Sequence, residues 1–294
     1  MSDKYHDTIA ASNVATDDKA VSAAVNEILS KHQAENQNQD VYRFLFNTID
    51  LTTLKSTDSP SSVAAFTERV NAFEEEHPEL PGVAAICVYP NFAQVVRTVL
   101  EVSSVRLACV AGCFPTSQSF IEVKVAEVAL AVEAGADEID IVLNVGNFLD
   151  GDYEEVADEI SELKHSCRDA RLKVILETGA LKTAENIRAA SILALYSGAD
   201  FLKTSTGKEY PGASLEAAYV MCQCIKEYYE KTGNRVGFKC SGGVSTTEDA
   251  VKYYTIVKEV LGEEWLTNDY FRIGASRLAN NLLGDILGQE VKFF

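Results

Sequence analysis

The sequence lacks the residue patterns of metal-binding and disulfide-bonded proteins. It has four histidines and seven cysteines in 294 residues, and it contains no CxxC motif. No histidine pairs with a cysteine at the spacing of a zinc site, so we expect no metal and no bound cofactor. The cysteine count is odd and several cysteines lie in apolar runs, which favours reduced thiols in a reducing compartment over a disulfide framework.

Long apolar runs and positive charge are also scarce. No apolar run approaches the roughly 18 residues of a membrane span, and the polar residues 1–13 do not resemble a signal peptide. The chain has 26 basic and 44 acidic residues, a formal net charge of −18. Because such a surface repels nucleic acid and anionic membranes, we expect neither as a partner. The reduced cysteines and the lack of a signal peptide or membrane span lead us to expect a cytoplasmic protein. An anionic substrate must then be held by local groups.

The sequence does contain a repeated strand–helix pattern, which begins near Val41 and continues almost to the end of the chain. The expected strands, the first of them at 41–52, are nearly continuous apolar runs, as in parallel sheets covered on both faces. Eight such units with right-handed crossovers predict an α/β fold, the (β/α)8 or TIM barrel. An open doubly wound sheet is the alternative, but no GxGxxG follows the first expected strand.

Residues 1–40 precede this pattern and are polar and prone to form helix. Val21, Val25, Ile28 and Leu29 have helical spacing. We therefore expect residues 1–40 to form an N-terminal helical extension and linker, which could cap the bottom of the barrel or contact another subunit. Residues 41–294 are expected to form one barrel domain.

Two expected strands end in a lysine that is followed by small residues. Lys203 lies in "GADFLKTSTGK" and Lys239 in "VGFKCSGGV". A single lysine usually extends its charge to the surface, but two at matching positions of successive strands would meet at the carboxyl-terminal end of the barrel. Two adjacent ammonium groups lower the pKa of one of them, and a neutral lysine forms Schiff bases with carbonyls.

Asp140 is the candidate acid–base group, at the end of the fourth expected strand. A carboxylate between two lysines can stabilise one ammonium and relay protons. Glu138 lies on the same face two residues earlier, and the choice between them depends on depth along the strand. A buried salt-bridge partner is the alternative role for Asp140.

A phosphate site is predicted in the loops that follow strands six, seven and eight. Glycines let backbone N–H groups approach an anion, helix N-termini favour negative charge, and TIM barrels often bind phosphate after strands seven and eight. The candidate residues are Thr206, Gly207, Lys208, Gly242, Gly243, Gly274 and Ser276.

A Schiff-base lysine, a second lysine, an aspartate and a phosphate site suit a class I aldolase. The motifs "IDLTTL", "AAICVYP", "GADEIDIVLNVG", "KVILETG", "GADFLKTSTGK", "GFKCSGGV" and "FRIGAS" resemble the deoxyribose-phosphate aldolase family from about Val41 to Leu287. The resemblance implies a metal-independent TIM barrel that reversibly cleaves 2-deoxy-D-ribose 5-phosphate to acetaldehyde and glyceraldehyde 3-phosphate. It also implies a homodimer or homotetramer.

The same resemblance implies roles for individual residues. Lys203 would form the Schiff base, Lys239 would lower the pKa of Lys203, and Asp140 would relay protons. The glycine-rich loops with Lys208 and Ser276 would hold the phosphate. The residues implied to line the pocket are Asp50 and Cys87.

Three features depart from compact members of that family: the N-terminal extension, Arg277 in place of a second small residue, and a Val-Lys-Phe-Phe ending where some relatives have a tyrosine. The extension and the ending leave open a catalytically weak barrel that serves as a binding scaffold. Retention of buried Lys203, Lys239 and Asp140 argues against it, because buried charges cost stability. Another Schiff-base aldolase is the third hypothesis, which the paired lysines disfavour.

Overall fold

A closed barrel of eight parallel strands in chain order forms the centre of the computed structural model, which describes residues 4–294. The strands are β1 (Ile49–Thr52), β2 (Ala85–Val88), β3 (Arg106–Val110), β4 (Glu138–Val142), β5 (Arg171–Ile175), β6 (Phe201–Lys203), β7 (Gly237–Ser241) and β8 (Phe271–Ala275). β8 pairs with β1, with Ile273 opposite Ile49, and so closes the sheet. This confirms the predicted (β/α)8 barrel and excludes the open sheet.

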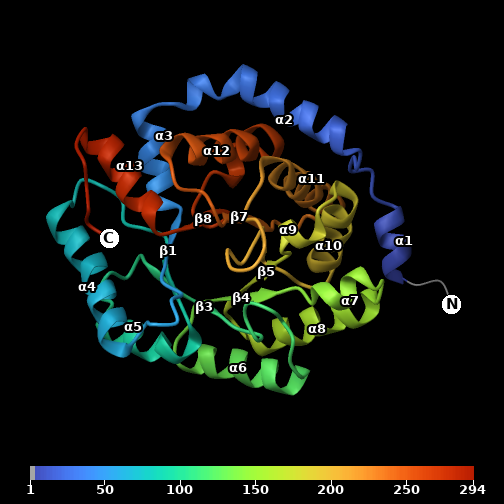
Figure 1. Cartoon of the computed structure of the whole chain (residues 1–294), viewed down its shortest axis with the longest axis horizontal. Coiled ribbons are helices and arrows are strands. Elements are labelled where there is room, and N and C mark those ends of the chain that lie inside the picture. The colour runs from blue at the N-terminus through green and yellow to red at the C-terminus, as the bar shows by residue number, and fades with distance from the viewer. Residues whose placement is uncertain (1–3) are drawn as a thin grey trace.

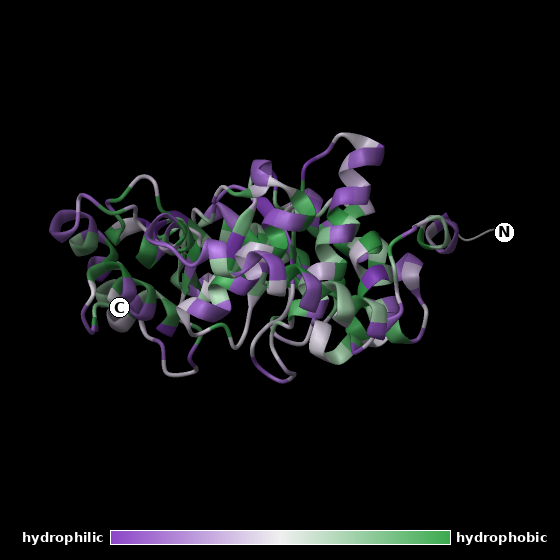
Figure 2. Ribbon diagram, turned by 90° about the horizontal axis from the view of Figure 1, so that it is seen from above, coloured by the Kyte–Doolittle hydropathy of each residue, from purple (hydrophilic) through white to green (hydrophobic). Residues whose placement is uncertain are grey.

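Amphipathic helices surround the barrel (Figure 1). The main helices after each strand are α4 (Pro60–Glu76), α5 (Ala93–Val99), α6 (Ile121–Glu133), α8 (Tyr153–Ser166), α10 (Ala184–Tyr196), α11 (Leu215–Thr232), α12 (Thr247–Leu261) and α13 (Arg277–Leu287). Figure 2 shows hydrophilic and hydrophobic residues alternating along the outer helices, as expected when one face packs on the barrel. Two short helices that the sequence pattern did not predict, α7 (Val145–Leu149) and α9 (Thr178–Leu181), follow β4 and β5.

The first expected strand was wrong over most of its length. Residues Gln39–Asn47 form helix α3, and β1 covers only Ile49–Thr52. The side chain of Asn38 accepts a hydrogen bond from the backbone N–H of Val41 at 3.1 Å and caps the helix. Val41 and Leu45 are both buried at helical spacing, so one turn of a helix explains the apolar residues that suggested a strand.

The segment before α3 forms two helices rather than one, α1 (Lys4–Ala10) and α2 (Asp18–His32). α2 arches over α11 and α12 (Figure 1) and packs against both. Val21 and Val25 are buried, as their spacing predicted. The segment therefore lies along the sides of the outer helices, and the division after residue 40 falls inside α3.

Polar contacts also join this segment to the barrel helices. The Asp18 carboxylate accepts a hydrogen bond from the Ala184 backbone N–H at 2.8 Å, at the start of α10. The Asn36 side chain donates to the Thr255 hydroxyl of α12 at 3.0 Å. Within residues 4–294, no helix has the length and apolar character needed to cross a membrane.

Candidate active site

Seven charged side chains are buried inside the barrel, and each is at most 4% exposed. They are Asp50 on β1, Glu138 and Asp140 on β4, Lys173 on β5, Lys203 on β6, Lys239 on β7 and Arg272 on β8. They project from the strands toward one another, since side chains on one face of a strand recur every second residue. Burial of so many charges is tolerable only if they are paired.

Asp140 lies at the centre of this cluster. Its Oδ2 atom accepts hydrogen bonds from Lys203 Nζ at 2.7 Å and from Lys239 Nζ at 2.8 Å, and its Oδ1 accepts one from Lys173 Nζ at 2.8 Å. Burial alone would raise the pKa of Asp140, but the three ammonium groups hold that pKa well below its usual range. Asp140 is therefore an ionised carboxylate shared by three amines.

Lys203 and Lys239 are direct neighbours across the β6–β7 pair. Burial lowers the pKa of Lys203, and the Lys239 charge adds to this, so the pKa falls despite the attraction of Asp140. Lys239 has a second carboxylate partner, since its Nζ donates to Asp50 at 2.5 Å. Asp140 and Asp50 together raise the pKa of Lys239 although burial opposes them. The two lysines therefore differ: the pKa of Lys203 is lowered, and the pKa of Lys239 is raised.

Lys173 and Arg272 complete the cluster and were missed from the sequence. Lys173 Nζ lies 2.6 Å from the Glu138 carboxylate. The Arg272 guanidinium contacts Asp50 at 2.6 Å and Glu138 at 2.9 Å. The available signal was a basic residue within each apolar strand, in "RLKVIL" and "YFRIGAS".

The same contacts distinguish the two carboxylates of β4. Glu138 precedes Asp140 along the strand and is therefore farther from its carboxyl-terminal end. Both carboxylates bond Lys173, but Glu138 also bonds Arg272, whereas Asp140 also bonds Lys203 and Lys239. Depth along the strand places Asp140 beside the lysine pair.

Asp50, Cys87 and Gly274 also lie against the cluster. Asp50 is bonded to Lys239 and Arg272, and these charges lower its pKa even though it is fully buried. Burial raises the pKa of the Cys87 thiol, which keeps it neutral beside the cluster. A Cβ atom on Gly274 would lie 3.1 Å from Lys239 Cε, so a glycine here leaves room for that side chain.

Six of the seven candidate phosphate residues line two cavities, and Gly274 lines neither. Thr206, Gly207, Lys208 and Ser276 line one of about 630 Å³. Gly242 and Gly243 line another of about 340 Å³. The two loops touch, because a Cβ atom on Gly242 would lie 3.3 Å from the Cα atom of Gly207. Gly207 and Gly242 have φ angles of +72° and +83°, which favour glycine.

Glu177, also missed, holds the loop that carries Lys208. The Thr206 hydroxyl donates to Glu177 Oε2 at 2.5 Å and accepts the Lys208 backbone N–H at 3.2 Å. Glu177 itself has a φ of +55°, a strained conformation for a residue with a side chain. Lys208 Nζ donates to the Leu54 carbonyl at 2.5 Å, which links the loops after β6 and β1.

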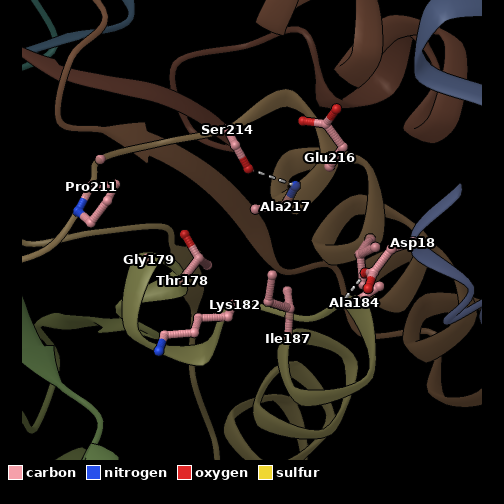
Figure 3. Close-up of a pocket in the computed structure, with 12 residues that line it drawn as sticks. Asp18, Thr178, Gly179, Lys182, Ala184, Ile187, Pro211, Ser214, Glu216 and Ala217 are labelled. Carbon is pink, nitrogen blue, oxygen red and sulfur yellow. Dashed lines mark hydrogen bonds between the residues drawn. The ribbon is translucent and has the colours of Figure 1, made fainter. Parts of the chain in front are cut away.

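A third cavity, of about 280 Å³, has Thr178, Gly179 and Pro211 in its wall (Figure 3). It is lined from α9, α10 and α11, and Asp18 of α2 closes one side. A Cβ atom on Gly179 would lie 2.3 Å from the Pro211 carbonyl oxygen, so α9 packs directly against the chain between β6 and α11. This contact packs α9 against the segment that connects β6 to α11, which also carries Lys208.

The fold and the buried lysine cluster together define a barrel enzyme of the aldolase class. Residues 44–261 match the model described as "DeoC/LacD family aldolase". Relatives include the "Deoxyribose-phosphate aldolase" of Mus musculus, 41% identical over 80% of this chain and 77% of that protein. The protein of the same name from Homo sapiens is 40% identical over the same shares of each chain. The chain belongs to the DeoC/LacD family of aldolases.

Solved structures agree with this assignment. The structure titled "QR15, an Aldolase" superposes with a TM-score of 0.67 at 28% identity, and the match covers 83% of this chain and 96% of that one. The deoxyribose phosphate aldolase of Aeropyrum pernix, described as tetrameric, has a TM-score of 0.69 at 24% identity, covering 88% of this chain and 97% of that one. The second match supports the fold alone.

Proposed function

We propose that the protein is a class I aldolase that reversibly cleaves 2-deoxy-D-ribose 5-phosphate to acetaldehyde and D-glyceraldehyde 3-phosphate, in the catabolism of deoxyribose phosphates. The observation that carries the proposal is the environment of Lys203. It is a buried lysine with a lowered pKa at the carboxyl-terminal end of β6, where TIM barrels place their chemistry. The family relatives named above carry the same activity in their names.

In the cleavage direction, the neutral Lys203 amine adds to the C1 aldehyde of the open-chain sugar. One proton is taken up as water is lost, which leaves a protonated imine. A base then removes the proton of the C3 hydroxyl. The C2–C3 bond breaks, its electron pair moves toward the imine, and D-glyceraldehyde 3-phosphate leaves. The remaining enamine is protonated at C2, and hydrolysis of the imine releases acetaldehyde and regenerates Lys203.

Asp140 and Lys239 support these proton transfers. The three ammonium groups keep the pKa of Asp140 well below its usual range, so its carboxylate stays ionised. We assign it a proton relay through water because it accepts hydrogen bonds from both Lys203 and Lys239. Lys239 remains charged through its bonds to Asp50 and Asp140 and so keeps the pKa of Lys203 low. Cys87 closes the wall beside the amines as a neutral thiol.

The phosphate group is assigned to the loops after β6, β7 and β8. Lys208 supplies charge, and the glycines bring backbone N–H groups close to the anion. The N-terminus of α13, which follows Ser276, adds the favourable end of a helix dipole. The residues assigned are Thr206, Gly207, Lys208, Gly242, Gly243, Gly274 and Ser276.

The wider organisation is also part of the proposal. We assign residues 1–40 to an extension and residues 41–294 to the barrel domain, with a cytoplasmic location and no partner among nucleic acids or membranes. A homodimer or homotetramer fits the tetramer named for the Aeropyrum pernix relative. Light scattering of the purified protein would test the assembly.

Borohydride trapping with acetaldehyde, followed by peptide mass mapping, tests the chemistry. We expect one reduced adduct, on Lys203, and none in the Lys203→Ala variant, which should stay folded and lose turnover of 2-deoxy-D-ribose 5-phosphate. An adduct on Lys239 instead would reverse the roles of the two lysines. A folded parent protein with no adduct on either lysine would rule out the Schiff-base mechanism.

A further inference from the structure

The cavity that contains Lys208 extends well beyond the proposed phosphate loops. Lys55, Arg69 and Arg277 also line it, and we call these three residues the rim cations. Lys55 follows β1, Arg69 lies on α4 and Arg277 begins α13, so three separate elements bring the charges to one place. In a chain with a net charge of −18, this cavity is a local excess of positive charge.

The rim cations have no acidic partners. Within residues 4–294, no carboxylate forms an ion pair with the side chain of Lys55, Arg69 or Arg277. Some other surface arginines are paired, such as Arg97 with Asp137 at 2.7 Å and Arg235 with Glu264 at 2.6 Å.

One acidic residue, Asp58, lines the same cavity. Both of its carboxylate oxygens accept the Thr53 hydroxyl at 2.9 Å, and one accepts the Lys55 backbone N–H at 2.9 Å. Asp58 therefore stabilises the turn after β1, and its carboxylate forms no ion pair with the rim cations.

The size of the cavity indicates a ligand larger than the phosphate end of a triose. Its volume of about 630 Å³ falls within the range of roughly 300–1,000 Å³ that accommodates drug-sized molecules. The side chains of Phe66 and Phe294 form part of the cavity wall. The Arg69 guanidinium lies 5.7 Å from the centre of the Phe66 ring, and this cation–π contact orients the guanidinium. Lys208 is assigned to the phosphate group of the aldolase substrate, so the rim cations remain available for a second anionic group.

We propose that the rim cations form a second anion subsite, which binds the second phosphate group of a diphosphate or a sugar bisphosphate. Guanidinium groups are suited to this role because they bind phosphate oxygens in a bidentate manner. Such a ligand occupies the phosphate loops with one group and the subsite with the other, and it competes with the aldolase substrate. The assignment of the first phosphate rests on the proposed function.

Isothermal titration calorimetry with inorganic phosphate and pyrophosphate tests the subsite. For the parent protein we expect pyrophosphate to bind at least about tenfold more tightly than phosphate, because one of its phosphate groups contacts the phosphate loops and the other contacts the rim cations. In the Arg69→Gln/Arg277→Gln variant the two affinities should differ by less than about threefold. The matched control is Lys19→Gln/Lys226→Gln, which removes the same charge at two exposed sites on α2 and α11 and should keep the full preference.

Two outcomes would overturn the subsite: equal affinities in the parent, or a preference that survives removal of both arginines. Titration with ribose 1,5-bisphosphate and ribose 5-phosphate identifies the class of ligand. Tighter binding of the bisphosphate would indicate a sugar bisphosphate, whose two phosphate groups are far apart. A preference for pyrophosphate without a preference for the bisphosphate would indicate a diphosphate. The proposed aldolase function fails separately, if the parent turns over no 2-deoxy-D-ribose 5-phosphate while the preference for pyrophosphate persists.

Discussion

The barrel interior and the cavity at its rim use charge in opposite ways. Inside, every amine has a carboxylate partner within hydrogen-bonding distance, as Lys203 and Lys239 have in Asp140. At the rim, Arg69 and Arg277 are exposed and have no acidic partner among the described residues. Paired buried charges set the pKa of a reacting group, whereas free exposed charges remain available for a ligand. The buried residues of the barrel interior are therefore suited to catalysis, and the exposed cations at the rim are suited to ligand binding.

The largest effect is expected from Asp140→Asn, which leaves three amines around a neutral amide. Breaking a buried ion pair costs about 3–5 kcal/mol because the remaining charges are uncompensated. Turnover should fall at least about 10²-fold because the proton relay is lost. Urea unfolding and steady-state kinetics measure the two effects. Asp137→Asn is the control, three residues before Asp140 in the sequence and with a side chain that is 43% exposed, and it should change both by little.

A smaller effect is expected from Lys239→Leu, which removes the positive charge beside Lys203. Since that charge lowers the pKa of Lys203, its removal raises this pKa, and the neutral amine becomes scarcer at pH 7. The acidic limb of the pH–rate profile should move to higher pH, with activity at pH 7 reduced by about 10- to 100-fold. Lys239→Arg keeps the charge and should keep the position of the limb. An unchanged profile in Lys239→Leu would contradict the pKa-lowering role.

The smallest effect is expected at the rim, from Thr206→Val. The variant loses the hydroxyl that bonds Glu177 and the Lys208 backbone, and the phosphate loop becomes less ordered. KM for D-glyceraldehyde 3-phosphate should rise about 3- to 10-fold with little change in kcat, because only binding is affected. KM for D-glyceraldehyde, which lacks the phosphate, should stay the same. An equal fall in kcat would instead place Thr206 in the chemical step.

Much of the catalytic centre could be predicted because it depends on strand order. Lys203 and Lys239 end adjacent strands, and parallel pairing alone brings them together. Lys173 lies opposite Asp140 in the adjacent β4–β5 pair, so the same argument would have found it. Arg272 could not be assigned in this way, because its partner Glu138 lies on β4 and the contact from β8 crosses the interior of the closed barrel. Such contacts depend on barrel closure and side-chain depth, which a strand pattern does not contain.

The errors in predicting the fold also arise where the local sequence pattern is ambiguous or short. In α3, apolar residues at 41–46 fit either a strand or a helix, and the deciding Asn38 cap lies just outside the apolar run. The short helices α7 and α9 were missed because they are only one turn or slightly longer and have little periodicity to detect. The sequence indicated part of the cavity that contains Lys208, through the phosphate candidates Thr206, Gly207, Lys208 and Ser276. It did not indicate Lys55 and Arg69, because they reach the cavity from distant parts of the chain.

The composition of the buried cluster links charge balance to reactivity. It contains three carboxylates and four cations, so one positive charge is in excess when every group is ionised (4 − 3 = 1). Loss of one proton makes the interior electrically neutral, and Lys203 is the amine whose pKa is lowered. The form of the protein that can attack a carbonyl is thus the form with a balanced interior. The protonated imine restores the excess positive charge of the interior. This charge favours cleavage of the C2–C3 bond, because the electron pair of that bond moves to the imine and neutralises it.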